Sequence, residues 1–145
     1  MSVKRLSICV DLDGVLAKYD GWKGVGVIGN PIPGAADFTK ELGKLAHIII
    51  FTTRCKQYPV GKDHPIEVTG DTGDVTVSQL QHQVQQWLHR YGFHYDEIYI
   101  GQGKPIASAY IDDRALTCRP QDNAPGNPTF AFSETYFAAK RLLGV

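Results

Sequence analysis

The residues best suited to chemistry are two aspartates that directly follow an apolar run. The stretch SICVDLDGVL, residues 7–16, begins like a buried strand and then presents Asp11, Asp13 and Gly14. Carboxylates are costly to keep near a core unless they are paired, hydrogen-bonded or bound to a metal. We therefore expect Asp11 and Asp13 to form part of a site at the end of a strand.

Polar residues of the same kind follow two other apolar runs. Thr52 comes after three consecutive isoleucines and Phe51, and Asp112 and Asp113 come after AYI. The carboxyl ends of parallel strands lie along one edge of a sheet, where ligands of open α/β folds bind. The sequence therefore predicts that four carboxylates and one or two hydroxyls converge at that edge.

Strands that alternate with helices must position these groups, and this order indicates a parallel sheet covered on both faces. The expected fold class is α/β, a three-layer α/β/α Rossmann-like domain of about five strands over residues 1–145, without a separate cap domain. The expected strands cover residues 4–10, 47–51, 98–100, 109–111 and, as a short fifth, 116–118. Three helices are expected. The first opens at Pro33 and Gly34, the second spans 77–91, and the third begins at a Ser133 cap.

Composition limits the classes of protein that fit the chain. Its 145 residues have the size of one ordinary domain, and 15 basic residues balance 15 acidic ones. The formal net charge is zero, so overall charge gives no reason to expect binding to nucleic acids or to membrane surfaces. No apolar window is long enough to span a bilayer, and three widely spaced cysteines indicate a reducing compartment. We expect a cytoplasmic protein without membrane contact.

A cluster of carboxylates requires a cation, because like charges in a small site disfavour ionisation. Oxygen ligands of this kind suit Mg²⁺, which also binds substrate phosphates. Lys104, eight residues before Asp112, can add a second positive charge. Thr52 and Lys104 would then hold phosphate oxygens, and Gly14 would let the chain turn and bring backbone N–H groups near them. The expected ligand is a phosphate ester.

The two aspartates of the first motif suit two different tasks. Asp11 would be the nucleophile that forms an aspartyl-phosphate. Asp13 would protonate the leaving oxygen and then deprotonate the attacking water. An EF-hand calcium loop is the rival interpretation of DLDG, but its further ligand positions are not filled and a strand-like run replaces the helix.

Four motifs in order make the chain resemble the haloacid-dehalogenase-like (HAD) hydrolase superfamily, in particular its phosphatases. The motifs are DLDGV, IIIFT, the lysine of GKP, and AYIDD, and the likeness covers roughly residues 4–116. The resemblance implies that Mg²⁺ is bound by Asp11, by the main-chain carbonyl of Asp13 and by Asp112. It also implies that Asp113 binds through water or supports the ligands. An acid at position 13 is typical of the phosphatase branch.

The lengths of the intervening segments resemble the capless type of that superfamily. Residues 15–33 would form a flap-like loop, and 55–76 a long loop on the substrate side. Capless members accept large exposed substrates or use a neighbouring subunit as a lid, so a homo-oligomer is one expectation. Arg54 and Arg114 are similar to residues of polynucleotide-end phosphatases, but each is equally well interpreted as an ion-pair partner of the carboxylates. The expected substrate is a phosphorylated small molecule or a polynucleotide end.

Three functions remain after these arguments. The first is a Mg²⁺-dependent phosphatase that hydrolyses a phosphomonoester. The second is a phosphotransferase of the same fold, and the third is a non-catalytic module that senses or binds phosphate. Each motif also has a structural alternative: Asp112 and Asp113 could form a turn, Thr52 could end a strand, and Lys104 could be an ordinary surface lysine. Trp22 could be a lid residue or an anchor for its loop.

Overall fold

The computed structural model describes residues 6–24, 26–55, 75–101, 103–121 and 128–144. It divides the chain into two compact units, Met1–Asp113 and Arg114–Val145. The expectation of one domain over 1–145 stays a prediction. The described helices are too short or too polar to cross a membrane.

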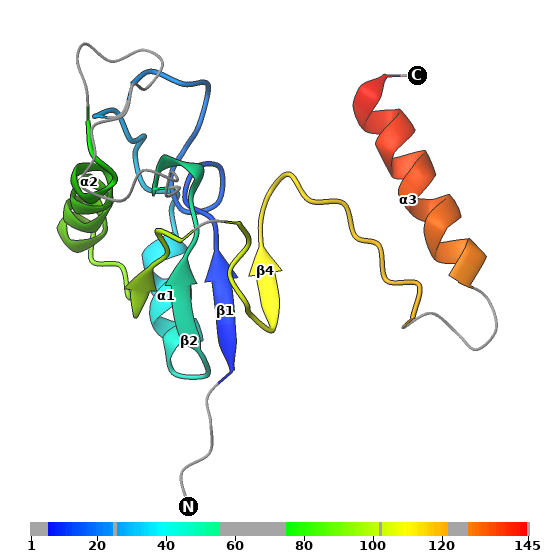
Figure 1. Ribbon diagram of the computed structural model, residues 1–145, viewed down its shortest axis with the longest axis horizontal. Coiled ribbons are helices and arrows are strands. Elements are labelled where there is room, and N and C mark those ends of the chain that lie inside the picture. The colour runs from blue at the N-terminus through cyan, green and yellow to red at the C-terminus, as the bar shows by residue number, and fades with distance from the viewer. Residues whose placement is uncertain (1–5, 25, 56–74, 102, 122–127, 145) are drawn as a thin grey trace, which may run out of the picture. The chain divides into compact units, whose positions relative to one another are not determined.

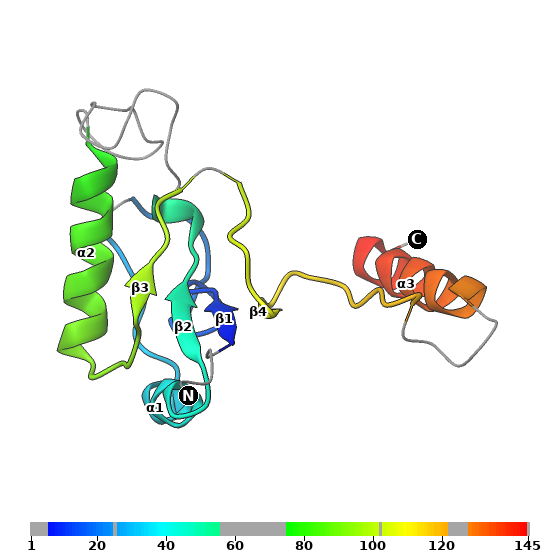
Figure 2. The ribbon, with the colours of Figure 1, turned by 60° about the horizontal axis from the view of Figure 1, so that its bottom comes forward.

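A parallel sheet with the strand order β3-β2-β1-β4 forms the centre of the first unit (Figure 1), and Figure 2 labels its four strands. Val10 pairs with Ile50 on one side and with Ile111 on the other, so β1 is an inner strand. The expected α/β class with a parallel sheet is confirmed, with four strands in the described part of the chain. Residues 116–118, expected to be a fifth strand, have no strand structure. The strands are β1 (Ser7–Val10), β2 (His47–Ile50), β3 (Glu97–Ile98) and β4 (Ala109–Ile111).

One face of the sheet forms the main core with the helices α1 (Ala35–Gly43) and α2 (Val77–Arg90). Val10, Ile50 and Ile98 belong to one cluster of buried side chains with residues from both helices. Alternate residues of a strand point to opposite faces. Cys9, next to Val10, is therefore buried on the other face, at 1% exposure.

Helix α2 follows the sequence pattern closely. Thr76 and Gln79 form a reciprocal capping box at its start, and Gly92 follows its end with φ 74°. A side chain that bonds the first free N–H groups and a glycine in the left-handed region are the usual ends of a helix. The apolar residues at helical spacing, which predict this helix, include Leu80, Val84, Trp87 and Leu88, and these four are buried.

Helix α1 turns a different face to the core from the one its pattern suggests. The helical spacing of Phe38, Leu42 and Leu45 predicts a buried stripe, but Phe38 and Leu45 are 42% and 78% exposed, whereas Thr39 is fully buried. The Thr39 hydroxyl donates to the Ala36 carbonyl and accepts from the His94 N–H. A buried hydroxyl with both partners carries little penalty, so a polar residue occupies the core position.

The second unit contains α3 (Pro128–Leu143). The helix begins at Pro128 and continues through Ser133, so the expected cap at Ser133 was wrong. Proline suits the first turn of a helix because that turn lacks a partner for its N–H groups. The Thr135 hydroxyl donates to the Thr117 carbonyl within this unit.

Candidate functional site

The backbone ladders of the sheet continue one residue beyond the strands and bring Asp11 to its edge. The Asp11 N–H donates to the Ile111 carbonyl at 3.0 Å, and the Phe51 N–H donates to the Val10 carbonyl at 3.0 Å. Carried one residue further, the two registers set Asp11 between Phe51 and Asp112. The edge expected from the sequence is therefore present, with an aromatic residue on one side of Asp11 and a carboxylate on the other.

Three carboxylates form a cluster at this edge. One oxygen from each of Asp11, Asp112 and Asp113 lies within 4.8 Å of the other two; Asp11 is partly buried and the other two are exposed. Oxygens on opposite sides of one Mg²⁺ ion are about 4.2 Å apart, and Ca²⁺ accepts a wider spacing. The cluster therefore fits a hard divalent cation after a small adjustment of the side chains.

The charge on Asp11 is strongly disfavoured in this arrangement. Burial raises the pKa of Asp11 to about 6, and the charges of Asp112, Asp113 and Asp13 contribute in the same direction. The Leu12 N–H, which donates to Asp11 Oδ1 at 2.8 Å, opposes the rise of that pKa. All three charged neighbours that shift the pKa are anions, so a bound cation would relieve the repulsion.

Gly14 gives Asp113 the room to approach the turn. Its φ is 88°, and a Cβ atom at this position would lie 2.2 Å from Asp113 Oδ2. The Gly14 N–H donates to the Ala17 carbonyl at 2.8 Å. Its amide thus holds the turn after Asp13, and the expected contact of backbone N–H groups with phosphate at this turn stays a prediction.

Asp13 is engaged by an arginine from the end of the neighbouring strand. Arg54 Nε donates to Asp13 Oδ2 at 2.7 Å, and an Arg54 terminal nitrogen donates to Oδ1 at 3.0 Å. The Arg54 side chain is only 4% exposed and that of Asp13 is 16% exposed. Two-pronged pairs of this kind are strong and orient both partners. Of the two interpretations of Arg54, ion-pair partner and substrate contact, the observed contacts are those of an ion pair.

The flap-like segment 15–33 contacts this arginine at two points. Arg54 also donates to the Val27 carbonyl at 3.0 Å, and its guanidinium lies 4.8 Å from the centre of the Trp22 ring. The two ends of the segment are held together because Ala17, which is fully buried, forms an isolated β-bridge with Pro31. Trp22 thus contacts the arginine that holds Asp13. The long loop predicted at 55–76 falls mostly on 56–74, outside the described residues.

Thr52 is buried at the carboxyl end of β2, at 2% exposure. Its hydroxyl accepts from the Arg54 N–H at 3.2 Å, and its carbonyl accepts from the Cys55 N–H at 3.1 Å, which begins the short helix η1 (Thr53–Cys55). Burial raises the pKa of the Cys55 thiol to about 12, so that cysteine is unreactive.

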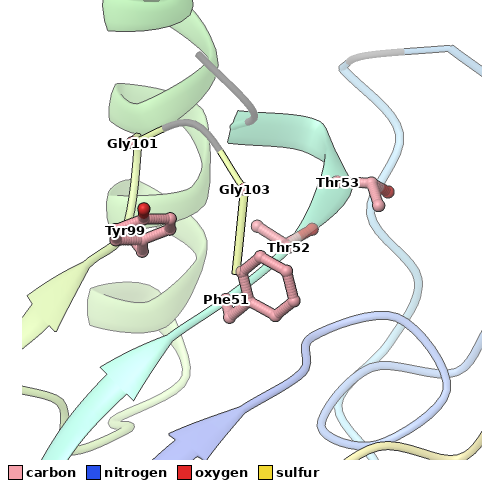
Figure 3. A pocket seen from close by; sticks show the side chains of 6 residues that line it. All are labelled: Phe51, Thr52, Thr53, Tyr99, Gly101 and Gly103. Atoms are coloured by element: carbon pink, nitrogen blue, oxygen red, sulfur yellow. The ribbon is translucent and has the colours of Figure 1, made fainter. Parts of the chain in front are cut away.

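A cavity of about 210 Å³ opens beside Thr52 (Figure 3). Phe51 and Tyr99 are aromatic walls of this cavity, and sequence reasoning gave neither a role. The signal that could have found Phe51 is strand alternation, which sets it on the same face and at the same level as Asp11. The lining residues are Phe51, Thr52, Thr53, Tyr99, Gly101 and Gly103.

Lys104 and Arg114 are the two other cationic residues expected at the site. Lys104 is exposed, and its Nζ lies 4.0 Å from the centre of the Tyr110 ring, whose hydroxyl donates to the Pro105 carbonyl. Its described contact is therefore with an aromatic ring on β4, and the contact with phosphate stays a prediction. Arg114 begins the second unit, so its expected role at the site also stays a prediction.

No family model and no curated protein matches the chain. A solved structure, described as a conserved protein coded by a locus from Bacteroides thetaiotaomicron, is similar with a TM-score of 0.49 and 18% sequence identity. The match covers 78% of this chain and 79% of that chain. The description of that protein names no activity.

Proposed function

We propose that the chain is a Mg²⁺-dependent phosphomonoester hydrolase of the HAD-like, capless phosphatase type, which acts through an aspartyl-phosphate on Asp11. The observation that carries the proposal is the convergence of Asp11, Asp112 and Asp113 oxygens within 4.8 Å. Their strands are separated by nearly a hundred residues, yet each ends at the same edge. The proposal includes the three-layer Rossmann-like arrangement, which requires a helix on the face of the sheet opposite α1 and α2.

The donor set supports the choice of metal. Carboxylate oxygens are hard ligands, and Mg²⁺ is usually held by one or two of them together with substrate phosphate. Asp11, Asp112 and Asp113 would hold the ion, with the main-chain carbonyl of Asp13 as a further ligand. When bound, the ion would supply positive charge that offsets the repulsion between an anionic nucleophile and an anionic phosphoryl group.

In the first half of the reaction an Asp11 oxygen attacks phosphorus. The bond from that oxygen to phosphorus forms as the ester bond breaks, and the leaving oxygen takes a proton from Asp13. Thr52 is suited to hold a phosphoryl oxygen, because a hydroxyl that accepts one hydrogen bond from Arg54 can still donate its own proton. Lys104 would supply the second contact after leaving the ring of Tyr110.

In the second half, water attacks the aspartyl-phosphate and Asp13 takes its proton. Inorganic phosphate leaves, and Asp11 returns to its carboxylate form. Both oxygens of Asp13 accept from Arg54 in the structure, and each oxygen keeps a second lone pair that can bind a proton. The proposal therefore requires that Asp13 carry its proton on one of these lone pairs while Arg54 holds it in place.

The same ion pair favours one of the alternatives. A carboxylate that accepts hydrogen bonds from a buried arginine on both oxygens is firmly oriented by that pair, as expected of a structural ion pair in a non-catalytic module that binds phosphate. A phosphotransferase would use the same first step with an acceptor other than water. The substrate is a phosphorylated small molecule or a polynucleotide end, and a lid from a second subunit stays part of the proposal.

The test is hydrolysis of an aryl phosphate with and without Mg²⁺ by the wild type, Asp11→Asn and Asp112→Asn. Both variants should lose activity, and Asp37→Asn, an exposed aspartate in the first turn of α1, should retain it. Equal activity of wild type and Asp11→Asn would overturn the proposal. A binding module would hold phosphate without hydrolysis and form no beryllium fluoride adduct at Asp11. Product analysis with added sugars or nucleosides would identify a phosphotransferase.

A further inference from the structure

We infer that the aromatic cavity beside Asp11 is the leaving-group site, and that it takes a small planar ring attached to the phosphate through at most one carbon atom. This inference rests on the proposed function and names a substrate class for it. It uses the described residues of β1, β2 and β3 and the segments that follow them.

The cavity belongs to the same row of residues as the carboxylates. The Tyr99 N–H donates to the Ile50 carbonyl at 2.8 Å, which continues the register of β2 and β3 by one residue. The order across the edge of the sheet is therefore Tyr99, Phe51, Asp11 and Asp112. Alternation of side chains puts all four on one face. The carboxylates stand on the β4 side of Asp11 and the aromatic rings on the β2–β3 side.

The walls of the cavity suit a flat apolar group. The Phe51 and Tyr99 rings meet edge to face with their centres 6.1 Å apart (Figure 3). Two glycines complete the lining, and a Cβ atom at Gly101 would lie 2.5 Å from the Tyr99 hydroxyl. Aromatic side chains bind planar rings by stacked or edge-to-face contact. A side chain at Gly101 would collide with one of these walls.

The size of the cavity limits the group that enters it. Its volume is about 210 Å³, smaller than the roughly 300–1,000 Å³ of sites for drug-sized ligands. One ring fits such a space, and a large ligand does not. Thr52 lines the cavity and is also the proposed phosphate contact. A substrate would therefore extend from the phosphate site directly into the cavity.

The spacing of the strands limits the linker between ring and phosphate. Neighbouring strands are about 4.8 Å apart, so the middle of the Phe51–Tyr99 pair lies roughly 7 Å along the edge from Asp11. Reacting atoms approach to about 3 Å, which leaves about 4 Å along the edge between phosphorus and a ring that stacks over the pair, because Phe51 and Tyr99 contact each other and admit no ring between them. Bonds of about 1.5 Å make this the reach of an aryl or arylmethyl phosphate. A ribose between ring and phosphate would be too long.

The experiment compares benzyl phosphate, ethyl phosphate and adenosine 5′-monophosphate at saturating Mg²⁺. Benzyl and ethyl phosphate have alcohol leaving groups of similar acidity, so a difference reports the ring. We expect kcat/KM for benzyl phosphate to exceed that for each of the others at least tenfold. Equal kcat/KM for benzyl and ethyl phosphate would overturn the inference and leave the phosphatase proposal standing. A preference for the nucleotide would overturn the short linker.

The variants assign the preference to the cavity. Tyr99→Leu and Phe51→Leu should each reduce kcat/KM for benzyl phosphate about tenfold more than kcat/KM for ethyl phosphate. Tyr95→Leu, a matched change before β3 begins, should change neither. A thermal unfolding curve checks that each variant is folded. If both cavity variants retain the preference, the ring binds elsewhere and the inference is wrong.

Measurements of phosphonate binding can test this inference even if the proposed function fails. If the wild type hydrolyses no ester, calorimetry with the non-hydrolysable benzylphosphonate and ethylphosphonate, each with Mg²⁺, replaces the rates. Tighter binding of benzylphosphonate to the wild type, lost in Tyr99→Leu, would support the ring site in a protein that is not a phosphatase. Equal binding of the two phosphonates would overturn it.

Discussion

Replacing Asp11 by asparagine should stabilise the metal-free protein, although it removes the proposed nucleophile. The folded protein holds the pKa of Asp11 at about 6, above the ordinary value of 3.8, because of burial and three neighbouring carboxylates. The folded state therefore binds this proton more tightly than the unfolded state does. Stability should fall as the pH rises from about 4 to about 6, and the loss should be complete above that range.

The magnitude follows from the shift of the pKa. A rise from 3.8 to about 6 corresponds to about 3 kcal/mol at roughly 1.4 kcal/mol per unit. Asp11 is only partly buried, and solvent screening reduces the effect to about half, ~1.5 kcal/mol. For a chain of this length, that free energy raises Tm by about 3–6 °C. Asparagine avoids the charge and can still accept the hydrogen bond from the Leu12 N–H.

Thermal unfolding with a chelator at pH 4, 6 and 8 measures the effect. Asp11→Asn should exceed the wild type in Tm at pH 8, and the difference should vanish near pH 4. Addition of Mg²⁺ should raise the Tm of the wild type more than that of the variant. Asp37→Asn is the control, and it should be slightly destabilising because an acidic residue in the first turn favours a helix. A lower Tm for Asp11→Asn at pH 8, or a difference independent of pH, would refute this account of the cluster.

Three further predictions concern Arg54, Gly14 and two of the cysteines. Arg54→Met should destabilise the fold by about 3–5 kcal/mol in urea unfolding, since it leaves the Asp13 carboxylate buried and unpaired; the double variant with Asp13→Asn should recover most of this loss, and full additivity would show that the pair is not coupled. Gly14→Ala should abolish stabilisation by Mg²⁺, because the new methyl group collides with a carboxylate of the cluster; an unchanged rise in Tm with Mg²⁺ would contradict this. Iodoacetamide at pH 8 should modify the exposed Cys118 and spare Cys55, as mass spectrometry would show, because burial raises the pKa of the Cys55 thiol to about 12; modification of Cys55 in the native protein would contradict its burial.

Local pattern was sufficient for much of the sheet and for one helix. The apolar runs that end at Asp11 and at Asp112 form β1 and β4, because β-branched and other apolar residues in a row favour a strand; β1 ends in buried residues, whereas β4 is largely exposed. Helical spacing and the residues at both ends predicted α2 within one residue. The meeting of Asp11, Asp112 and Asp113 followed from the rule that parallel strands end at a common edge.

The early start of α3 and the buried Thr39 were beyond that kind of reasoning. Pro128 precedes the predicted cap at Ser133 by five residues, and proline is read more readily as part of a loop than as the first residue of a helix. Thr39 occupies a core position because its hydroxyl finds a donor in the His94 N–H, 55 residues away. The spacing of apolar residues does not predict a hydrogen-bond partner so far away in the sequence.

The sequence by itself determined which carboxylates would share an edge, since strand ends and alternation are local properties. Only the tertiary structure decided what those carboxylates face: Asp13 pairs with Arg54, 41 residues away, and Asp113 approaches within the space left by Gly14. The physical reason is that an ion pair and a close approach depend on the separation of atoms in space. The fold sets that separation through turns and crossings that residue type does not encode locally.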